Sequence, residues 1–153
     1  MDKIKGVNVD AFTRAYLECA LWSSTDNSRD DGGDPLDQNY DLEDIERKSL
    51  ASMARDCRDF QKHHAKLLEQ AYAAAPCTCA ADGAPAGHTT TCARVRQPRY
   101  TEEQAGHDFW LTRNGHGAGF WDRGLGTVGE ELSKASKPYG TVDLYVHRKR
   151  VYC

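Results

Sequence analysis

The chain has 153 residues, and its 20 lysines and arginines against 23 aspartates and glutamates give a formal net charge of −3. With 39% hydrophobic residues, this length predicts one domain (1–153) with one hydrophobic core and substantial polar loops. The weak negative charge argues against strong non-specific binding of nucleic acid, which needs a basic field, and no apolar run is long enough to predict a membrane span.

The first ten residues, MDKIKGVNVD, lack the apolar core of a secretion signal. We therefore expect a cytoplasmic, reducing environment in which the six cysteines form no disulfides.

The first predicted helix follows an irregular arm at residues 1–9. Asp10 is a suitable N-cap, because its carboxylate can accept hydrogen bonds from the free amides of the first turn, and the helix is expected to reach Ser23. Its spacing turns one apolar stripe toward the core, formed by Phe12, Tyr16, Cys19 and Ala20.

Residues 24–41 are rich in Ser, Asp, Asn and Gly and predict a long acidic surface loop. A calcium loop is the alternative, with Asp26, Asp30, Asp31 and Asp34 as ligands. An EF-hand needs acids at alternating positions and a glutamate at the twelfth, which this spacing does not match, so we favour a solvated loop.

A long helix is predicted over residues 50–75, with Ser49 as its cap and Pro76 after its end. Its apolar residues alternate spacings of three and four: Leu50, Met53, Cys57, Phe60, His64, Leu67 and Ala71. Such a helix exceeds the radius of the domain, so one end is expected to project or to pair with a second copy in a homodimer. His64 is interpreted as a partly buried histidine with a local partner rather than as a catalytic residue.

Residues 76–99 form a predicted insertion that carries Cys77, Cys79, His88 and Cys92. Three thiolates and an imidazole can bind one structural zinc ion, which would staple the loop and leave no open position for catalysis. The closely spaced C-x-C pair strains such a site, so we favour a flexible insertion with free thiols and keep zinc as the alternative.

The stretch from His107 to Gly124, HDFWLTRNGHGAGFWDRG, combines aromatic, charged and glycine residues more densely than any other part of the chain. Asn114-Gly115 at its middle is typical of a type I′ turn, so we predict a central β-hairpin. The expected pairs are Phe109 with Phe120, Leu111 with Ala118 and His107 with Asp122, with Trp110 and Trp121 on the other face.

The flanking segments complete the predicted fold. Thr101 is expected to cap a brief helical turn over residues 100–105, and Thr127 with Glu130 to form a capping box for a helix that ends near Lys137. Alternation over residues 142–146 predicts a strand, and a turn at 147–150 returns a short strand at 151–153. The result is an α+β fold, in which N-terminal helices pack on a small antiparallel sheet built from the central β-hairpin and the C-terminal strands.

The sequence HDFWLTRNGHGAGFWDRGLG, with the helix and the VDLYV strand that follow it, resembles a family of small proteins encoded by tailed bacteriophages. The segments ECALWSS and GGDPLDQNYDLEDI are similar to that family too. This sequence departs from the family in the cysteine-bearing segment and in the last turn, which reads HRKR where relatives tend to carry Asp-Gly-type turns. The resemblance implies a phage origin and the host cytoplasm, but no agreed biochemical activity.

Three functions are open for residues 107–124. The favoured one is a recognition surface with exposed π-faces and guanidinium donors, formed by His107, Trp110, Arg113, Asn114, His116, Phe120, Trp121, Asp122 and Arg123. It would make the protein a non-enzymatic phage accessory protein that antagonises host defence by masking a host protein or sequestering a small nucleotide ligand. One alternative is a metal-dependent hydrolase or nuclease that uses His107, Asp108, His116 and Asp122. The other alternative is a purely structural or interaction role.

Overall fold

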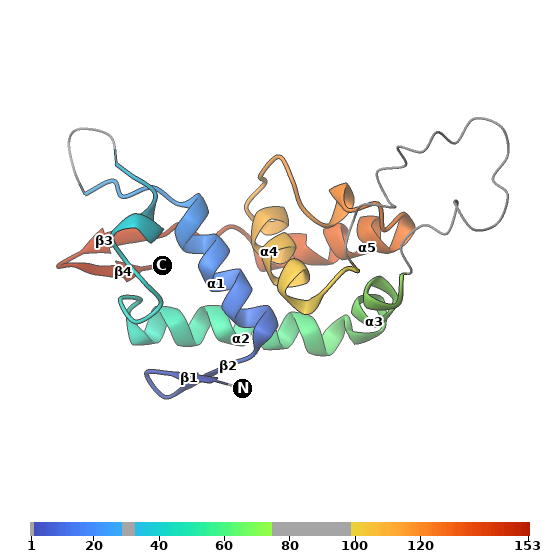
Figure 1. Ribbon diagram of the computed structural model, residues 1–153, viewed down its shortest axis with the longest axis horizontal. Coiled ribbons are helices and arrows are strands. Elements are labelled where there is room, and N and C mark those ends of the chain that lie inside the picture. The colour runs from blue at the N-terminus through green and yellow to red at the C-terminus, as the bar shows by residue number, and fades with distance from the viewer. Residues whose placement is uncertain (1, 29–32, 75–98) are drawn as a thin grey trace, which may run out of the picture.

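The computed structural model describes residues 2–28, 33–74 and 99–153. In these residues five α-helices and two small antiparallel hairpins confirm the predicted α+β class. Figure 1 shows α1 (Ala11–Ser23) and α4 (Glu102–Arg113) lying over the long run of α2 (Arg47–His63) and α3 (Ala65–Ala73), with one hairpin near each terminus. No helix in the described part of the chain is both long and apolar enough to cross a membrane.

Helix α1, Ala11–Ser23, has the predicted bounds and the predicted cap. The Asp10 carboxylate accepts a 2.8 Å hydrogen bond from the Thr13 amide, and the four predicted stripe residues are all buried. The main partner of α1 is α4, Glu102–Arg113. At Gly106 in α4, a Cβ atom would lie 2.1 Å from the Phe12 carbonyl oxygen, so glycine lets the two backbones approach closely.

The predicted central β-hairpin is wrong, because the residues of its first strand form α4. Thr101 does cap this segment, accepting a hydrogen bond from the Gln104 amide at 3.2 Å, but the helix continues to Arg113. Asn114-Gly115 then ends the helix: the Gly115 amide donates to Thr112 O and the His116 amide to Leu111 O, with Gly115 at φ 72°. These are the two bonds of a Schellman motif, which needs the same left-handed backbone as a type I′ turn. The dipeptide therefore marks a helix end here.

The second half of the predicted hairpin is a short 3₁₀ helix, Phe120–Asp122. The Phe120 ring reaches the core, where Phe60 lies between Phe109, at 4.1 Å between ring centroids, and Phe120, at 5.8 Å. Phe109 and Phe120 are thus near each other as predicted, but through packing on α2 instead of strand pairing.

The N-terminal residues are ordered as a hairpin, so the predicted irregular arm is wrong. Strands β1, Asp2–Ile4, and β2, Val7–Val9, pair through a two-residue turn at Lys5-Gly6. Ile4 and Val9 are buried in the core, and this apolar contact holds the arm in place.

The described parts of the acidic segment 24–41 are joined at their base by backbone hydrogen bonds. The Asp26 amide donates to Asp34 O and the Leu36 amide to Ser24 O, both at 2.9 Å. A short 3₁₀ helix, Leu36–Gln38, follows, and it buries Leu36 completely. Asp30 and Asp31, two of the four predicted calcium ligands, lie outside the described residues.

The predicted helix over residues 50–75 is two helices, α2, Arg47–His63, and α3, Ala65–Ala73. Glu46 caps α2 in place of the predicted Ser49, because its carboxylate accepts from the Lys48 and Ser49 amides. His64 breaks the helix with φ −117° and ψ 22°. Its half-buried ring packs on Phe60, 4.9 Å between centroids, and burial lowers its pKa, with His63 adding to the effect. The break turns α3 onto α5 (Thr127–Ser136). A single projecting helix is therefore not formed, and the homodimer stays a prediction.

Helix α5, Thr127–Ser136, lies where the sequence predicts it, but the predicted capping box is absent. Gly126 occupies the cap position and Thr127 is already helical, so no side chain caps the helix. Leu132 points into the core as predicted, and a 3₁₀ turn, Lys137–Tyr139, closes the segment.

The C-terminal strands are β3, Tyr145–His147, and β4, Arg150–Tyr152. The predicted strand at 142–146 starts late, because the Asn114 side chain accepts the hydrogen bond of the Val142 amide at 2.8 Å. The predicted return strand is confirmed within one residue. Hydrogen bonds of Val151 with Asp44 and Glu46 anchor β4 to the chain before α2.

The β3–β4 turn places Arg148 at φ 48° and Lys149 at φ 59°, in the left-handed region that side chains other than Asn and Gly avoid. We expect Arg148→Asn with Lys149→Gly to raise the free energy of unfolding by about 1 kcal/mol, measured by denaturant unfolding. The matched control is Arg148→Gln with Lys149→Gln, which removes the same charges but leaves the backbone strain in place. This variant should be as stable as the parent. Equal stability of the two variants would contradict the strain argument.

Candidate functional site

Trp110, a predicted recognition residue, is part of the core. Its side chain is 1% exposed, and its indole N–H donates a 2.7 Å hydrogen bond to the Ser23 hydroxyl. Helix α4 turns it toward α1, where it meets the Tyr16 ring edge-on at 5.2 Å. It therefore has no face available to a ligand.

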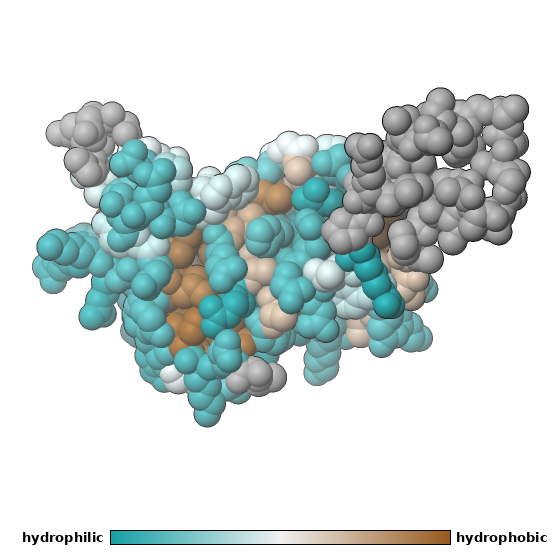
Figure 2. Space-filling view, in the orientation of Figure 1, coloured by the Kyte–Doolittle hydropathy of each residue, from teal (hydrophilic) through white to brown (hydrophobic). Residues whose placement is uncertain are grey.

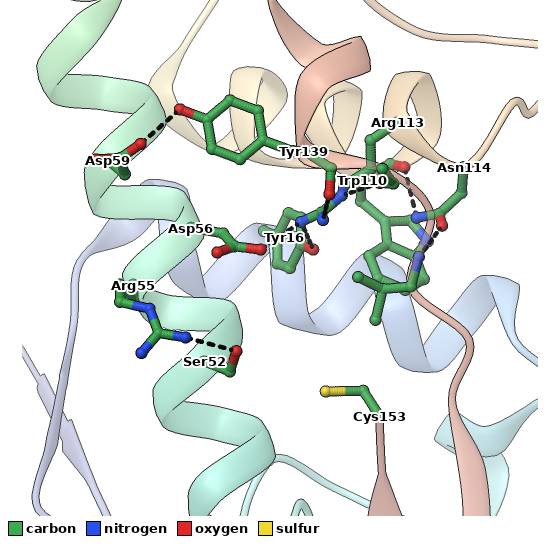
Figure 3. Close-up of polar contacts among 12 residues, drawn as sticks. Tyr16, Ser52, Arg55, Asp56, Asp59, Trp110, Arg113, Asn114, Tyr139 and Cys153 are labelled. Atoms are coloured by element: carbon green, nitrogen blue, oxygen red, sulfur yellow. Dashed lines mark hydrogen bonds and ion pairs between the residues drawn. The ribbon is translucent and has the colours of Figure 1, made fainter.

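Arg113, the last residue of α4, is also turned inward. Figure 3 shows its guanidinium between α1, α2 and the chain after α5. It donates to the Tyr16 hydroxyl at 2.8 Å, to Asp56 Oδ2 at 3.0 Å and to the carbonyls of Tyr139 and Gly140. Burial raises the pKa of Tyr16 well above its ordinary value, so this hydroxyl stays protonated. The group ties three segments together, and its side chain is only 1% exposed, so it is not available to a partner.

Asn114 is used internally as well. Its side-chain amide donates to Trp110 O at 3.0 Å and accepts from the Val142 amide. The residue therefore joins the end of α4 to the segment that leads into β3.

Arg123 and Asp108 form an ion pair in which the carboxylate is buried and the guanidinium is partly exposed. The guanidinium contacts both carboxylate oxygens of Asp108, at 2.7 to 3.0 Å, and the Tyr100 hydroxyl donates to Asp108 Oδ2 at 2.8 Å. Asp108 is 0% exposed. Burial, together with Asp108, raises the pKa of the nearby Cys19 thiol to about 12. Asp108, one of the four residues of the predicted metal-dependent hydrolase, is thus bound by Arg123 and Tyr100 inside the protein.

The remaining predicted residues are dispersed. His116 and Asp122 are exposed, Trp121 is 54% exposed, and Phe120 is buried. Within residues 2–28, 33–74 and 99–153, no three His, Cys, Asp or Glu side chains are arranged to hold a metal ion, so the four predicted hydrolase residues do not form such a site. The predicted zinc ligands Cys77, Cys79, His88 and Cys92 lie outside the described residues.

A pocket of about 590 Å³ lies elsewhere, between α1, Ile4 of β1, residues 37–43 and His107 in the middle of α4. Its apolar wall consists of Ile4, Cys19, Leu21 and Leu42. Figure 2 shows apolar residues beside α1 with hydrophilic residues on both sides of them. The volume is within the range of about 300–1,000 Å³ that small-molecule and side-chain sites occupy.

Aromatic rings and carboxylates surround the apolar wall. Trp22, at the end of α1, is 59% exposed, and Tyr40 also lines the pocket. Four carboxylates line the pocket, those of Glu18, Asp37, Asp41 and Glu43. Arg14 is the only lysine or arginine in this described lining, and it is already paired with Asp2 at 2.8 Å and Glu18 at 3.7 Å. The pocket is therefore acidic and aromatic, which suits a cationic group.

The pocket lies outside the stretch 107–124 that the sequence predicts as the site, apart from His107. Its residues come from four separate segments, and only their composition is visible in the sequence: Trp22 ends an amphipathic helix, and acids recur from Asp37 to Glu43. Of the predicted recognition residues, His107 alone lines the pocket. Protein families, curated proteins and solved structures include none that matches this chain.

Proposed function

We propose that the protein is a non-enzymatic binding protein whose pocket takes a positively charged side chain from a segment of a partner protein. The observation that carries this proposal is the exposed Trp22 beside four carboxylates and one already paired arginine. A guanidinium or ammonium group would gain a cation–π contact with the indole and ion pairs with the carboxylates.

The charge of the pocket also separates two ligand classes. A nucleotide would bring phosphates next to Glu18 and Glu43, and like charges this close repel. A basic protein segment would place its charge among opposite charges, which favours both affinity and rate of association. We therefore favour a protein partner over a nucleotide.

The resemblance to a bacteriophage family makes a host protein the expected partner. Occupation of a basic segment of such a protein would mask it, and masking is one route by which a small binding protein antagonises host defence. A hydrolase is less well supported, because Asp108 is buried against Arg123 and Tyr100.

The test uses the fluorescence of Trp22. The variant Trp121→Phe keeps Trp22 in the pocket and the buried Trp110, so any change in emission on titration reports largely on the pocket. We expect saturable binding of a short peptide that contains two arginines and none of the counterpart with two glutamates.

Two further variants assign the binding to the pocket. Glu18→Gln with Glu43→Gln should lower the affinity for the arginine peptide roughly tenfold, since each ion pair contributes up to about 1 kcal/mol at a solvated site. The control, Glu130→Gln with Glu131→Gln on α5, removes the same charge from exposed residues outside the pocket and should have little effect. Equal losses in both double variants, or equal binding of the two peptides, would refute the proposal.

A further inference from the structure

The β3–β4 hairpin has two chemically different faces. The register pairs Tyr145 with Tyr152 and His147 with Arg150, while Val146 pairs with Val151 between them. Because side chains alternate along a strand, Tyr145, His147, Arg150 and Tyr152 share one face, and the two valines share the other. Val151 is completely buried and Tyr145 is 53% exposed, so the aromatic and basic face is the outer one.

The outer face carries a preformed aromatic platform. The rings of Tyr145 and Tyr152 stack at 5.5 Å with an interplanar angle of 19°, and His147 meets Tyr152 edge-on at 6.2 Å. This arrangement holds the tyrosine rings in place before any ligand arrives, which lowers the entropy cost of stacking on them.

Cations surround the platform at the turn. Arg148 and Lys149 are exposed and make no ion pair with any described residue. Arg150 lies within electrostatic reach of Glu46 and helps to lower the pKa of that carboxyl, although the amides of Ser49 and Lys48 contribute more. Figure 1 shows the hairpin at one end of the molecule, with its turn pointing outward. The basic side chains are therefore accessible.

The backbone at this turn is held in an unfavourable conformation. Arg148 and Lys149 both have positive φ, where Asn-Gly would fit without strain. Strained backbone concentrates at functional sites. The protein would thus be more stable with other residues at these two positions. The presence of two charged side chains there favours a role for their charge.

We propose that the outer face of the β3–β4 hairpin binds single-stranded nucleic acid. Exposed bases would stack on Tyr145, and phosphates would lie against Arg148, Lys149 and Arg150. In a duplex the base faces are covered by neighbouring bases and cannot stack on Tyr145. A duplex would therefore contact only the basic side chains, through its phosphates. The net charge of −3 makes the protein as a whole repel nucleic acid, which opposes strong binding. The three basic residues at the turn are consistent with weak binding over a short distance. The hairpin contributes no residue to the acidic pocket, so either proposal can fail without the other.

The experiment measures fluorescence anisotropy of a labelled twelve-nucleotide single strand, as DNA and as RNA, across a series of salt concentrations. With three cations neutralising phosphates, the slope of log K against log salt should be about −2. Arg148→Asn with Lys149→Gly should weaken binding at least tenfold and reduce the slope to about −0.7. This variant is expected to be more stable than the parent, so a loss of binding would not reflect unfolding.

Two other variants separate stacking from charge. Tyr145→Ala should weaken binding about tenfold and leave the salt slope unchanged, because it removes a stacking surface and no charge. The control, Arg58→Gln with Lys62→Gln on the exposed side of α2, removes the same charge as the turn variant and should bind like the parent. The proposal would be overturned by tighter binding of the corresponding duplex, by equal binding of polyglutamate, by an equal loss in the control, or by no binding of the single strands.

Discussion

Replacing Arg113 with alanine is expected to lower the free energy of unfolding by about 3 kcal/mol, the lower end of the usual cost of breaking a buried ion pair, because Asp56 is 30% exposed. The guanidinium is 1% exposed at its side chain and bonds to Tyr16, Asp56 and two carbonyls (Figure 3). Its loss would leave the Tyr16 hydroxyl and the Asp56 carboxylate without that partner in or near the core. Denaturant unfolding followed by circular dichroism measures the change.

Two variants show whether geometry or charge is responsible. Arg113→Lys keeps the positive charge but cannot reach all four acceptors, so an intermediate loss is expected. Arg55→Ala is the control on α2: Arg55 is exposed, its bond is to Ser52 nearby, and its loss should change stability by no more than about 0.5 kcal/mol. Comparable stability of Arg113→Ala and Arg55→Ala would show that the network is not structural.

Replacing Gly106 with alanine is expected to destabilise the protein by about 3 kcal/mol, at the upper end of overpacking costs. Helix propensity alone predicts the opposite sign, since alanine is favoured over glycine by about 1 kcal/mol in a helix interior. The added Cβ would lie 2.1 Å from Phe12 O and 2.9 Å from Phe12 C, and these are backbone atoms of α1 that cannot rotate away. Helices α1 and α4 would have to separate. The thermal and denaturant midpoints measure the effect.

Gly117→Ala is the matched control for this substitution. A Cβ atom at Gly117 would meet nothing within 4 Å, so its stability should stay close to that of the parent. If Gly106→Ala is as stable as Gly117→Ala, or more stable than the parent, the close contact of α1 with α4 does not limit the packing of the core.

Local sequence patterns predicted the structure correctly where a pattern is compatible with only one kind of element. Asp10 caps α1, and the apolar stripe of that helix lies in the core as its spacing predicts. The C-terminal hairpin was predicted for a similar reason, because alternation over a short segment has a period that a helix does not share.

The same signals failed where one pattern serves two structures. Asn114-Gly115 supplies a left-handed backbone, which both a type I′ turn and a helix C-terminus require. The apolar spacing of three and four continues through His64 and therefore predicts one helix. In the structure the helix breaks at His64, and α3 packs on α5. Each choice depends on contacts with distant segments that a local pattern does not contain.

The sequence by itself determined the α+β class, the first helix with its cap, and the presence of a dense aromatic and charged stretch at residues 107–124. Only the tertiary structure decided which of those groups are used internally. Arg113 and Arg123 are bound to Asp56 and Asp108, whereas Trp22, Glu18 and Glu43 are brought together at a pocket. The physical reason is that a charged or aromatic side chain suits a buried network and an exposed site equally well. Burial, which depends on how the helices pack, selects between the two.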